Sequence, residues 1–317
     1  MRILIAGATG AVGQRLVPML LDEGHEVVAM TRTAAKAEDL RKRGAMPVVA
    51  DALDRDAVMG AVLGAEPDVI VHQLTALTGA TDMKHFDRVF AATNRLRTEG
   101  LRNLLEAGRA AGTRRIIAQS FTGWPFAREG GPVKDEDAPL DPNPPKAQRE
   151  SLSAIRTLED MVTRAHETHG IEGVVLRYGG FYGPGTGLST RGEVTDLIAK
   201  RRLPIIGDGG GVWSFTHIDD AARAVVATLE LGGPQGVFAI VDDEPARVAE
   251  WIPAFADAIG AKPPRRVPTW LGKLAAGDVA VTMMTTSRGA SNARARTVLG
   301  WTPQWPSWRE GFLRGLG

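Results

Sequence analysis

Short, uniformly apolar runs alternate with amphipathic segments along the first 180 or so residues of the chain. The apolar runs have the length of strands, and the segments between them repeat apolar residues at helical spacing. Strands without a polar face are typical of a parallel sheet covered by helices on both sides. Their alternation with helices predicts a doubly wound α/β fold. The predicted strands are 2–7, 25–31, 47–51, 68–74, 114–120 and 173–179, and the predicted helices between them are 12–24, 34–44, 55–64 and 86–112.

Two later stretches interrupt this pattern. Residues 128–150 are rich in proline, glycine and charge, and they are predicted to form a surface loop. After residue 182, glycine-rich segments separate shorter predicted helices at 194–202 and 215–232. The change in character indicates a second structural unit in the C-terminal part of the chain.

The predicted organisation is a large sheet domain with a smaller C-terminal lobe. The sheet domain spans 1–182, and 216–242 returns to it; the lobe is formed by 183–215 and 243–317. Open α/β sheets bind ligands in the crevice at the carboxyl ends of their strands. The lobe is therefore expected to close over a substrate in that crevice.

A glycine-rich loop joins the first predicted strand to the first helix. In it, Gly7 permits a tight turn, Gly10 lets the backbone approach a pyrophosphate, and Gly13 lets the helix and the strand pack closely. The amides at the start of the helix would then face the phosphates. A simple turn is the alternative, but the strand–loop–helix context favours a dinucleotide site in a Rossmann fold. The cofactor contacts expected here come from Gly7, Thr9, Gly10, Ala11, Val12 and Gly13.

The residues after the second predicted strand favour NADP(H) over NAD(H). A carboxylate that would bind a ribose 2′-hydroxyl is absent between Val27 and Ala37, whereas Arg32 and Lys36 are present. Cations at this place suit a 2′-phosphate, although both are also common as solvated charges at a helix start. Asp51, after the third strand, is expected either to reach the adenine or to cap the next helix.

Composition excludes several classes of function. The chain of 317 residues has no cysteine, so disulfides and thiolate chemistry are excluded. A net charge of +1 offers no broad attraction to nucleic acid or to an anionic membrane, so the expected partner is a small-molecule substrate. The six histidines are scattered, and no metal site is predicted. Neither a signal peptide nor a membrane-spanning segment is recognised, which favours a cytoplasmic protein.

Taken together, the motifs resemble the extended branch of the short-chain dehydrogenase/reductases, the NAD-dependent epimerases and dehydratases, and their atypical members. The resemblance covers nearly the whole chain. It is carried by GATGAVG (7–13), Asp51, DVIVHQL (68–74), Asn94, IIAQS ending at Ser120, LRYGGFYGPG (176–185) and GDGGGVWSFTHIDDAARAV (207–225). It implies a Rossmann domain with a C-terminal substrate lobe, and a homodimer formed through helices near 94–111 and 151–166. It also implies cofactor contacts from the first loop, Arg32, Asp51, Ala52, Leu74, Ser120, Tyr178, Gly179, Gly180 and Phe181.

The chain departs from this family at the catalytic pair. The family uses a Ser or Thr at a strand end with Tyr-x-x-x-Lys on the next helix, where the lysine lowers the pKa of the tyrosine. The helix that begins near Arg149 aligns Ser151 with the tyrosine and Ile155 with the lysine, so Ile155 is expected to pack near the nicotinamide. The only tyrosines are Tyr178 and Tyr182, and neither is followed by a lysine four residues later.

Four side chains are therefore candidates for the missing proton donor. Ser120 matches the family's Ser or Thr, and Ser151 could reach the same substrate oxygen. Tyr182 and His217 lie on segments expected to border the crevice, and both residue types can move protons near neutral pH. Each also has a structural alternative: cofactor orientation for Ser120, a helix start for Ser151 and His217, and core packing for Tyr182.

The substrate is expected to be apolar or aromatic. Where nucleotide-sugar enzymes of the family carry an Asn and an Arg, this chain has Gly180 and Trp213, so a phosphate-binding arginine is lost and an indole is gained. Packing within the lobe is an equally good explanation of Trp213. Substrate contacts are expected from Phe121, Thr122, Tyr182 and Trp213.

Three functions remain open at this point. The favoured one is an NADP-dependent oxidoreductase that reduces a carbonyl or enone of an apolar or aromatic small molecule with a non-standard proton donor. The second is an isomerase, epimerase or lyase that retains its cofactor, and the third is a non-catalytic NADP-binding sensor. The intact phosphate loop is compatible with all three, whereas the lost Tyr/Lys pair favours the sensor and the lobe favours the enzymes.

Overall fold

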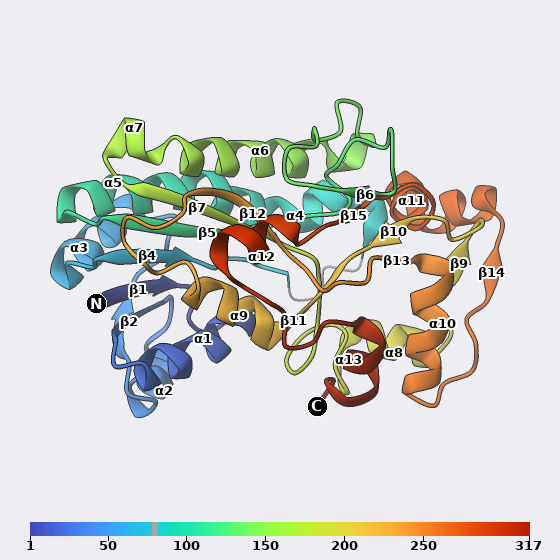
Figure 1. The fold of residues 1–317 in the computed structure, drawn as a ribbon, viewed down its shortest axis with the longest axis horizontal. Coiled ribbons are helices and arrows are strands. Elements are labelled where there is room, and N and C mark those ends of the chain that lie inside the picture. The colour runs from blue at the N-terminus through green and yellow to red at the C-terminus, as the bar shows by residue number, and fades with distance from the viewer. Residues whose placement is uncertain (78–81) are drawn as a thin grey trace.

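The computed structural model describes residues 1–77 and 82–317, and its centre is a seven-stranded parallel sheet (Figure 1). The strand order β12-β7-β5-β4-β1-β2-β3 confirms the doubly wound fold that the apolar runs predict. The strands are β1 (Arg2–Ala6), β2 (Glu26–Thr31), β3 (Met46–Val49), β4 (Val69–His72), β5 (Arg115–Phe121), β7 (Glu172–Tyr178) and β12 (Gly236–Ile240).

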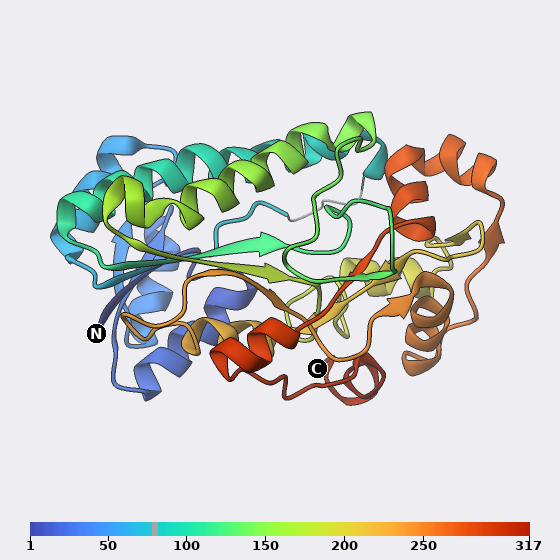
Figure 2. The same cartoon turned by 45° about the horizontal axis from the view of Figure 1, so that its top comes forward.

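Helices cover both faces of this sheet (Figures 1 and 2). Alternate residues of β1 show how the two cores form: Ile3 and Ile5 belong to one apolar cluster, and Leu4 to the other. A strand points successive side chains to opposite faces, so a fully apolar strand is stable only between two helical layers. One face carries α1 (Ala11–Asp22) and α9 (Ile218–Val226), and the other carries α3 (Arg55–Ala65), α5 (Leu101–Ala111), α6 (Arg149–Thr163) and α7 (Ala165–His169). Helix α2 (Ala34–Lys42) contributes Leu40 to the same apolar cluster as α1 and α9.

The long helix predicted over 86–112 is interrupted in its middle. It consists of α4 (Phe86–Arg95), a π-helical turn η2 (Leu96–Gly100) and α5. A π turn places one more residue in the turn than an α-helix does, and such turns occur frequently at functional sites. The buried residue Arg97 lies in this turn.

The C-terminal part is built from short strand pairs and helices at the carboxyl ends of the sheet strands, with its own apolar cluster. Two-stranded pairs are β8 (Gly180–Tyr182) with β11 (Phe215–His217), β9 (Ile205–Ile206) with β14 (Arg266–Val267), β10 (Val212–Trp213) with β13 (Ala246–Arg247), and β6 (Val133–Lys134) with β15 (Gly289–Ala290). The helices are α8 (Glu193–Ala199), α10 (Val248–Ala258), α11 (Thr269–Thr285), α12 (Ala293–Leu299) and α13 (Trp308–Arg314). Two short 3-10 turns lie earlier in the chain, η1 (Met83–His85) and η3 (Lys146–Gln148).

Three details of the predicted organisation are wrong. The helix predicted over 215–232 begins only at Ile218, because Phe215–His217 pairs as a strand with β8 and the His217 side chain accepts the Asp219 amide. The segment 128–150 is not wholly a surface loop, because it contains β6 and buries Glu136. Helix α12, placed by prediction in the lobe, contributes Ala295 to the core beside the main sheet.

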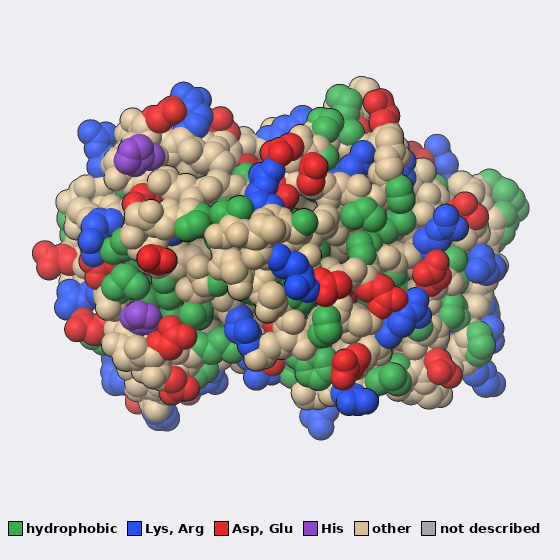
Figure 3. Space-filling view, viewed as in Figure 1, with side chains coloured by type: hydrophobic (Ala, Val, Ile, Leu, Met, Phe, Trp, Pro, Cys, Tyr) green, Lys and Arg blue, Asp and Glu red, His purple; other side chains and the backbone are tan. Residues whose placement is uncertain are grey.

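The surface mixes both signs of charge. On the face shown in Figure 3, acidic and basic side chains are interspersed. No helix within the described ranges has the length and apolarity needed to span a lipid bilayer.

Candidate active site and cofactor cleft

The glycine loop is held in a shape that only glycines allow. Gly7 has a φ of +104°, and a Cβ on it would lie 2.5 Å from the carbonyl oxygen of Gln73. A Cβ on Gly13 would lie 2.3 Å from the Gly7 carbonyl oxygen. Gly10 is the N-cap of α1 and has no side chain to cap it, so the first amides of this helix are left open. Such amides form a site for a phosphate.

A cleft of about 1290 Å³ opens over this loop. Its lining also includes most of the glycine-rich segment 184–193, together with Leu316 and Gly317. Of the predicted cofactor residues, the following line the cleft: Gly7, Thr9, Gly10, Ala11, Val12, Arg32, Lys36, Asp51, Ala52, Leu74 and Phe181. The size, the open helix start and the small residues of the loop fit a dinucleotide.

Other predicted cofactor residues lie beneath the cleft or beside it. Gly13 packs under the loop, and Gly180 lines a second cavity. Tyr178 is fully buried; its hydroxyl donates to the Ala221 carbonyl oxygen at 3.2 Å, and burial raises its pKa. A Cβ on Gly179 would lie 2.4 Å from the Ser214 carbonyl oxygen, so this glycine allows β11 to approach. These residues support the cleft but do not line it.

Two exposed cations stand at one end of the cleft. Arg32 follows β2 directly and Lys36 lies in α2. The structure gives neither side chain an ion pair or hydrogen bond with another described residue. Asp51, on the same wall, accepts the Leu53 amide at 3.0 Å, while the cap of α3 is Asp54.

A second cavity of about 240 Å³ adjoins the cleft. The two share Leu77, Gln119, Phe121 and Phe181, so a molecule in one lies against a molecule in the other. The predicted substrate residues Phe121, Thr122 and Trp213 line this cavity. Further aromatic walls are Phe86, Phe90 and Trp124, of which Phe86 stacks on Phe90 with ring centroids 4.1 Å apart. The cavity therefore suits a flat, apolar molecule.

Ser120 points away from both cavities. Its Oγ donates to Glu159 Oε1 at 2.7 Å, and Ser120 is 1% exposed. Its neighbours Gln119 and Phe121 line the cavities instead, as expected for alternating side chains on a strand. Glu159, on α6, also forms a buried pair with Arg177, with its two oxygens 2.8 and 2.7 Å from the guanidinium nitrogens.

Ser151 is fully buried at the start of α6. Its hydroxyl donates to Asp87 Oδ1 at 2.6 Å and accepts from Asn94 Nδ2 at 3.0 Å, while its amide donates to the same carboxylate. Asp87 therefore caps α6 from the neighbouring helix α4, and Ser151 joins the two helices. Ile155, one turn further on, is 0% exposed and lines neither cavity.

Tyr182 and His217 lie together in the C-terminal apolar cluster. Their ring centroids are 5.1 Å apart, and Phe312 meets Tyr182 edge to face. The His217 Nε2 donates to the Gly315 carbonyl oxygen at 3.0 Å, while its Nδ1 accepts from the Asp219 amide. Burial raises the pKa of Tyr182. The structure therefore does not bring the four candidate proton donors together, and none of them lines either cavity.

Arg97 is a charged cavity residue that the sequence did not predict, as it did not predict Phe86, Phe90 and Trp124. It is 4% exposed and lines the second cavity from η2. One signal was present in the sequence: Thr93, Arg97, Leu101 and Leu104 follow each other at helical spacing, so an arginine occupies a position of the buried stripe. Whether this buried arginine can contact a ligand depends on the cavity, and the stripe alone does not predict a cavity.

The open parallel sheet, the glycine loop and the long cleft define a dinucleotide-binding protein of the Rossmann class. Residues 3–240 match the NAD dependent epimerase/dehydratase family, and the chain belongs to that family.

Relatives and solved structures agree with this assignment. The chain is 46% identical over 317 residues to a 3-diazoavenalumate denitrifying reductase from Streptomyces sp, covering 99% of this chain and 100% of the relative. It is 29% identical to a UDP-glucose 4-epimerase from Mycolicibacterium smegmatis, covering 96% and 94% of the two chains. The crystal structure of UDP-glucose 4-epimerase from Thermotoga maritima matches with a TM-score of 0.77 at 22% identity, covering 100% of this chain and 97% of that one.

Proposed function

We propose that the protein is an NADPH-dependent reductase of a small aromatic or otherwise apolar molecule, which binds in the second cavity. The observation that carries the proposal is the composition of that cavity's wall. Among its described lining residues, none is Asp, Glu, His, Lys or Tyr. A substrate reduced in this cavity would therefore receive no proton from an Asp, Glu, His, Lys or Tyr side chain of the wall. This agrees with the loss of the Tyr/Lys pair.

The chain's own residues fit the cofactor. When bound, the reduced nicotinamide supplies a hydride. The open amides of α1 would hold the pyrophosphate, and Arg32 with Lys36 would hold a 2′-phosphate. The aromatic residues of the second cavity would position the substrate and exclude water from it.

The name of the Streptomyces relative, 3-diazoavenalumate denitrifying reductase, suggests a class of substrate whose reduction needs no proton. Reductive loss of nitrogen from an aryl diazonium group breaks the C–N bond, releases N₂ and forms a C–H bond with one hydride. The charge balances without a proton, because the cation and the hydride give a neutral product. An aromatic diazo compound is therefore our first candidate substrate.

Carbonyl or enone reduction is the second candidate, because the chain is 28% identical over 274 residues to a 2-alkyl-3-oxoalkanoate reductase from Stenotrophomonas maltophilia. This reaction would take its proton from water. Both reductions consume NADPH. Cofactor-retaining isomerisation and cofactor sensing do not, so measuring NADPH consumption distinguishes them from the two reductions.

Labelled cofactor tests the proposal directly. With NADPH carrying deuterium at the transferred position and benzenediazonium as probe, we expect enzyme-dependent NADPH oxidation, N₂ release and deuterium on the carbon that lost nitrogen. Benzaldehyde and chalcone test carbonyl and enone reduction in the same way, and heat-denatured protein is the control for spontaneous reduction. NADPH that stays unoxidised with all three probes would contradict the reductase.

Arg32→Asp tests the cofactor preference. We expect the variant to bind NADPH at least tenfold more weakly, a loss of about 1.4 kcal/mol, because a phosphate contact becomes a repulsion. NADH binding should change much less. Isothermal titration calorimetry measures both, and Arg43→Asp, an exposed site outside the cleft, is the matched control. Equal losses for the two cofactors would reject the NADP preference.

A further inference from the structure

Arg97 lines the second cavity and carries a buried positive charge. The structure gives its side chain no hydrogen bond or ion pair with another described residue, and its Nη1 is completely enclosed without a partner. A charge removed from water is costly unless it is paired. A guanidinium in this state indicates that its partner is a ligand.

Two other buried arginines of the chain, Arg115 and Arg177, are each paired with a glutamate. Arg115 is 0% exposed and lies 2.6 Å from a Glu172 oxygen, with further bonds to the carbonyl oxygens of Thr228 and Gly233. Arg177 is bidentate to Glu159. Arg97 differs from both in that it lines a cavity and forms no hydrogen bond or ion pair with another described residue.

Arg97 keeps its charge at neutral pH. Burial lowers its pKa to about 10, and the charge of Glu159 partly opposes this shift. The side chain is therefore protonated whenever a substrate binds near neutral pH.

A second polar group in the cavity also lacks a partner. The Oγ of Thr122 is buried, lines the same cavity and forms no hydrogen bond with a described residue. Both groups belong to residues that line one aromatic cavity, and a hydroxyl donor and a guanidinium are groups that bind an anionic oxygen.

We propose that the second cavity binds an aromatic molecule that carries an anionic oxygen, a carboxylate or a phenolate, which pairs with Arg97 and accepts a hydrogen bond from Thr122. This site rests on the proposed function, since it selects the substrate of that same cavity.

Binding measurements separate this proposal from catalysis. The NADP⁺-loaded protein is titrated calorimetrically with cinnamate, with its neutral isostere cinnamamide and with 2,4-dinitrophenolate. We expect at least one of the two anions to bind tenfold or more tightly than cinnamamide, and the tighter anion identifies the oxygen as carboxylate or phenolate. Anions that bind no better than cinnamamide would overturn the proposal.

Variants assign the effect to Arg97. Arg97→Met should abolish the preference for the anion and leave cinnamamide binding within about twofold, whereas Arg97→Lys should retain part of the preference as a point charge. Arg95→Met is the matched control, because Arg95 is exposed two residues away and pairs with Glu99. A preference that survives Arg97→Met would overturn the proposal.

Thermal unfolding shows whether Arg97→Met folds. Removing an unpaired buried charge should leave the Tm unchanged or raise it, and excess anion should raise the Tm of the unmodified protein only. If anion binding depends on Arg97 but none of the reducible probes oxidises NADPH, the reductase function fails while the anion site stands.

Discussion

Gly13→Ala is expected to destabilise the protein by about 3 kcal/mol and to weaken NADPH binding at least tenfold. The added Cβ would lie 2.3 Å from the Gly7 carbonyl oxygen and 2.7 Å from the Ala8 Cα. Both are backbone atoms, so relief requires the loop between β1 and α1 to move. The loop that should face the pyrophosphate is then displaced. Urea denaturation and calorimetric titration with NADPH measure the two effects.

Gly64→Ala is the matched control for this change. Gly64 lies in α3, and a Cβ on it would meet nothing within 4 Å. Because alanine has the higher helix propensity, this variant should gain up to about 1 kcal/mol and bind NADPH normally. A Gly13→Ala protein as stable as the unmodified one would show that the loop has more room than the structure gives it.

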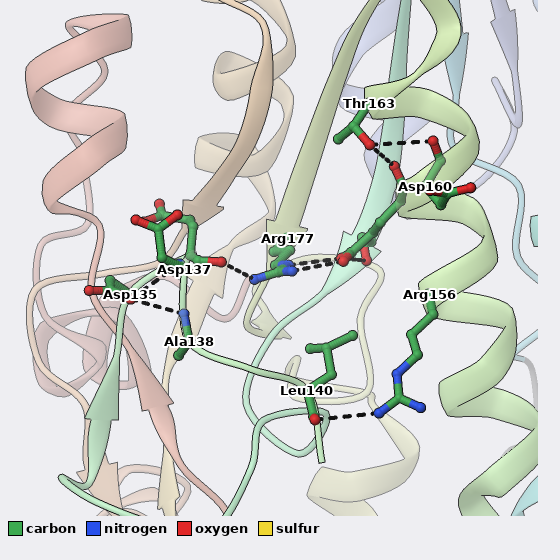
Figure 4. Close-up of polar contacts among 11 residues, drawn as sticks. Asp135, Asp137, Ala138, Leu140, Arg156, Asp160, Thr163 and Arg177 are labelled. Carbon is green, nitrogen blue, oxygen red and sulfur yellow. Dashed lines mark hydrogen bonds and ion pairs between the residues drawn. The ribbon is translucent and has the colours of Figure 1, made fainter. Parts of the chain in front are cut away.

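Glu159→Gln is expected to cost about 3 to 5 kcal/mol of folding free energy, because it leaves the Arg177 guanidinium buried without a counter-charge. Figure 4 shows Arg177 between α6 and the segment of Asp135, Asp137 and Ala138, where it also donates to the Glu136 carbonyl oxygen at 3.0 Å. Loss of this pair would loosen the contact between β7, α6 and that segment. Urea denaturation measures the cost.

Two further variants sharpen this second prediction. Replacing Glu159 by leucine and Arg177 by methionine together should recover much of the loss, because an apolar pair leaves no buried charge. Glu99→Gln, in an exposed pair with Arg95, should cost less than about 1 kcal/mol. If Glu159→Gln is as mild as Glu99→Gln, the buried pair does not stabilise the fold.

Local patterns predict most of the fold. The six apolar runs became six of the seven parallel strands, and the glycine loop lies where its spacing places it, because strand formation and tight turns depend on neighbouring residues. The seventh strand, Gly236–Ile240, also has an apolar run, VFAIV (237–241), which is not among the predicted strands. Its place at the sheet edge depends on pairing with β7. That pairing joins residues about 60 positions apart, so sequence periodicity does not reveal it.

The active site is predicted less well, because it depends on the direction of single side chains. Ser120 lies on the expected strand end, but its side chain faces α6 while Gln119 and Phe121 face the cavities. Successive side chains of a strand point to opposite faces of the sheet. A correctly predicted strand can therefore still have the wrong residues assigned to the face that borders the site. Arg97 lies on the buried stripe of 86–112, but the stripe does not distinguish a position packed among side chains from one that lines a cavity.

The indoles on the cavity wall give the protein a spectroscopic property of its own. Trp124 and Trp213 are two of seven tryptophans, and both line the second cavity. Trp213 also lies 5.2 Å from Trp251, ring centroid to ring centroid, within easy range of excitation transfer. A molecule that absorbs near the indole emission band would therefore quench part of the protein's fluorescence on entering the cavity. Tryptophan fluorescence would then report the occupancy of the second cavity.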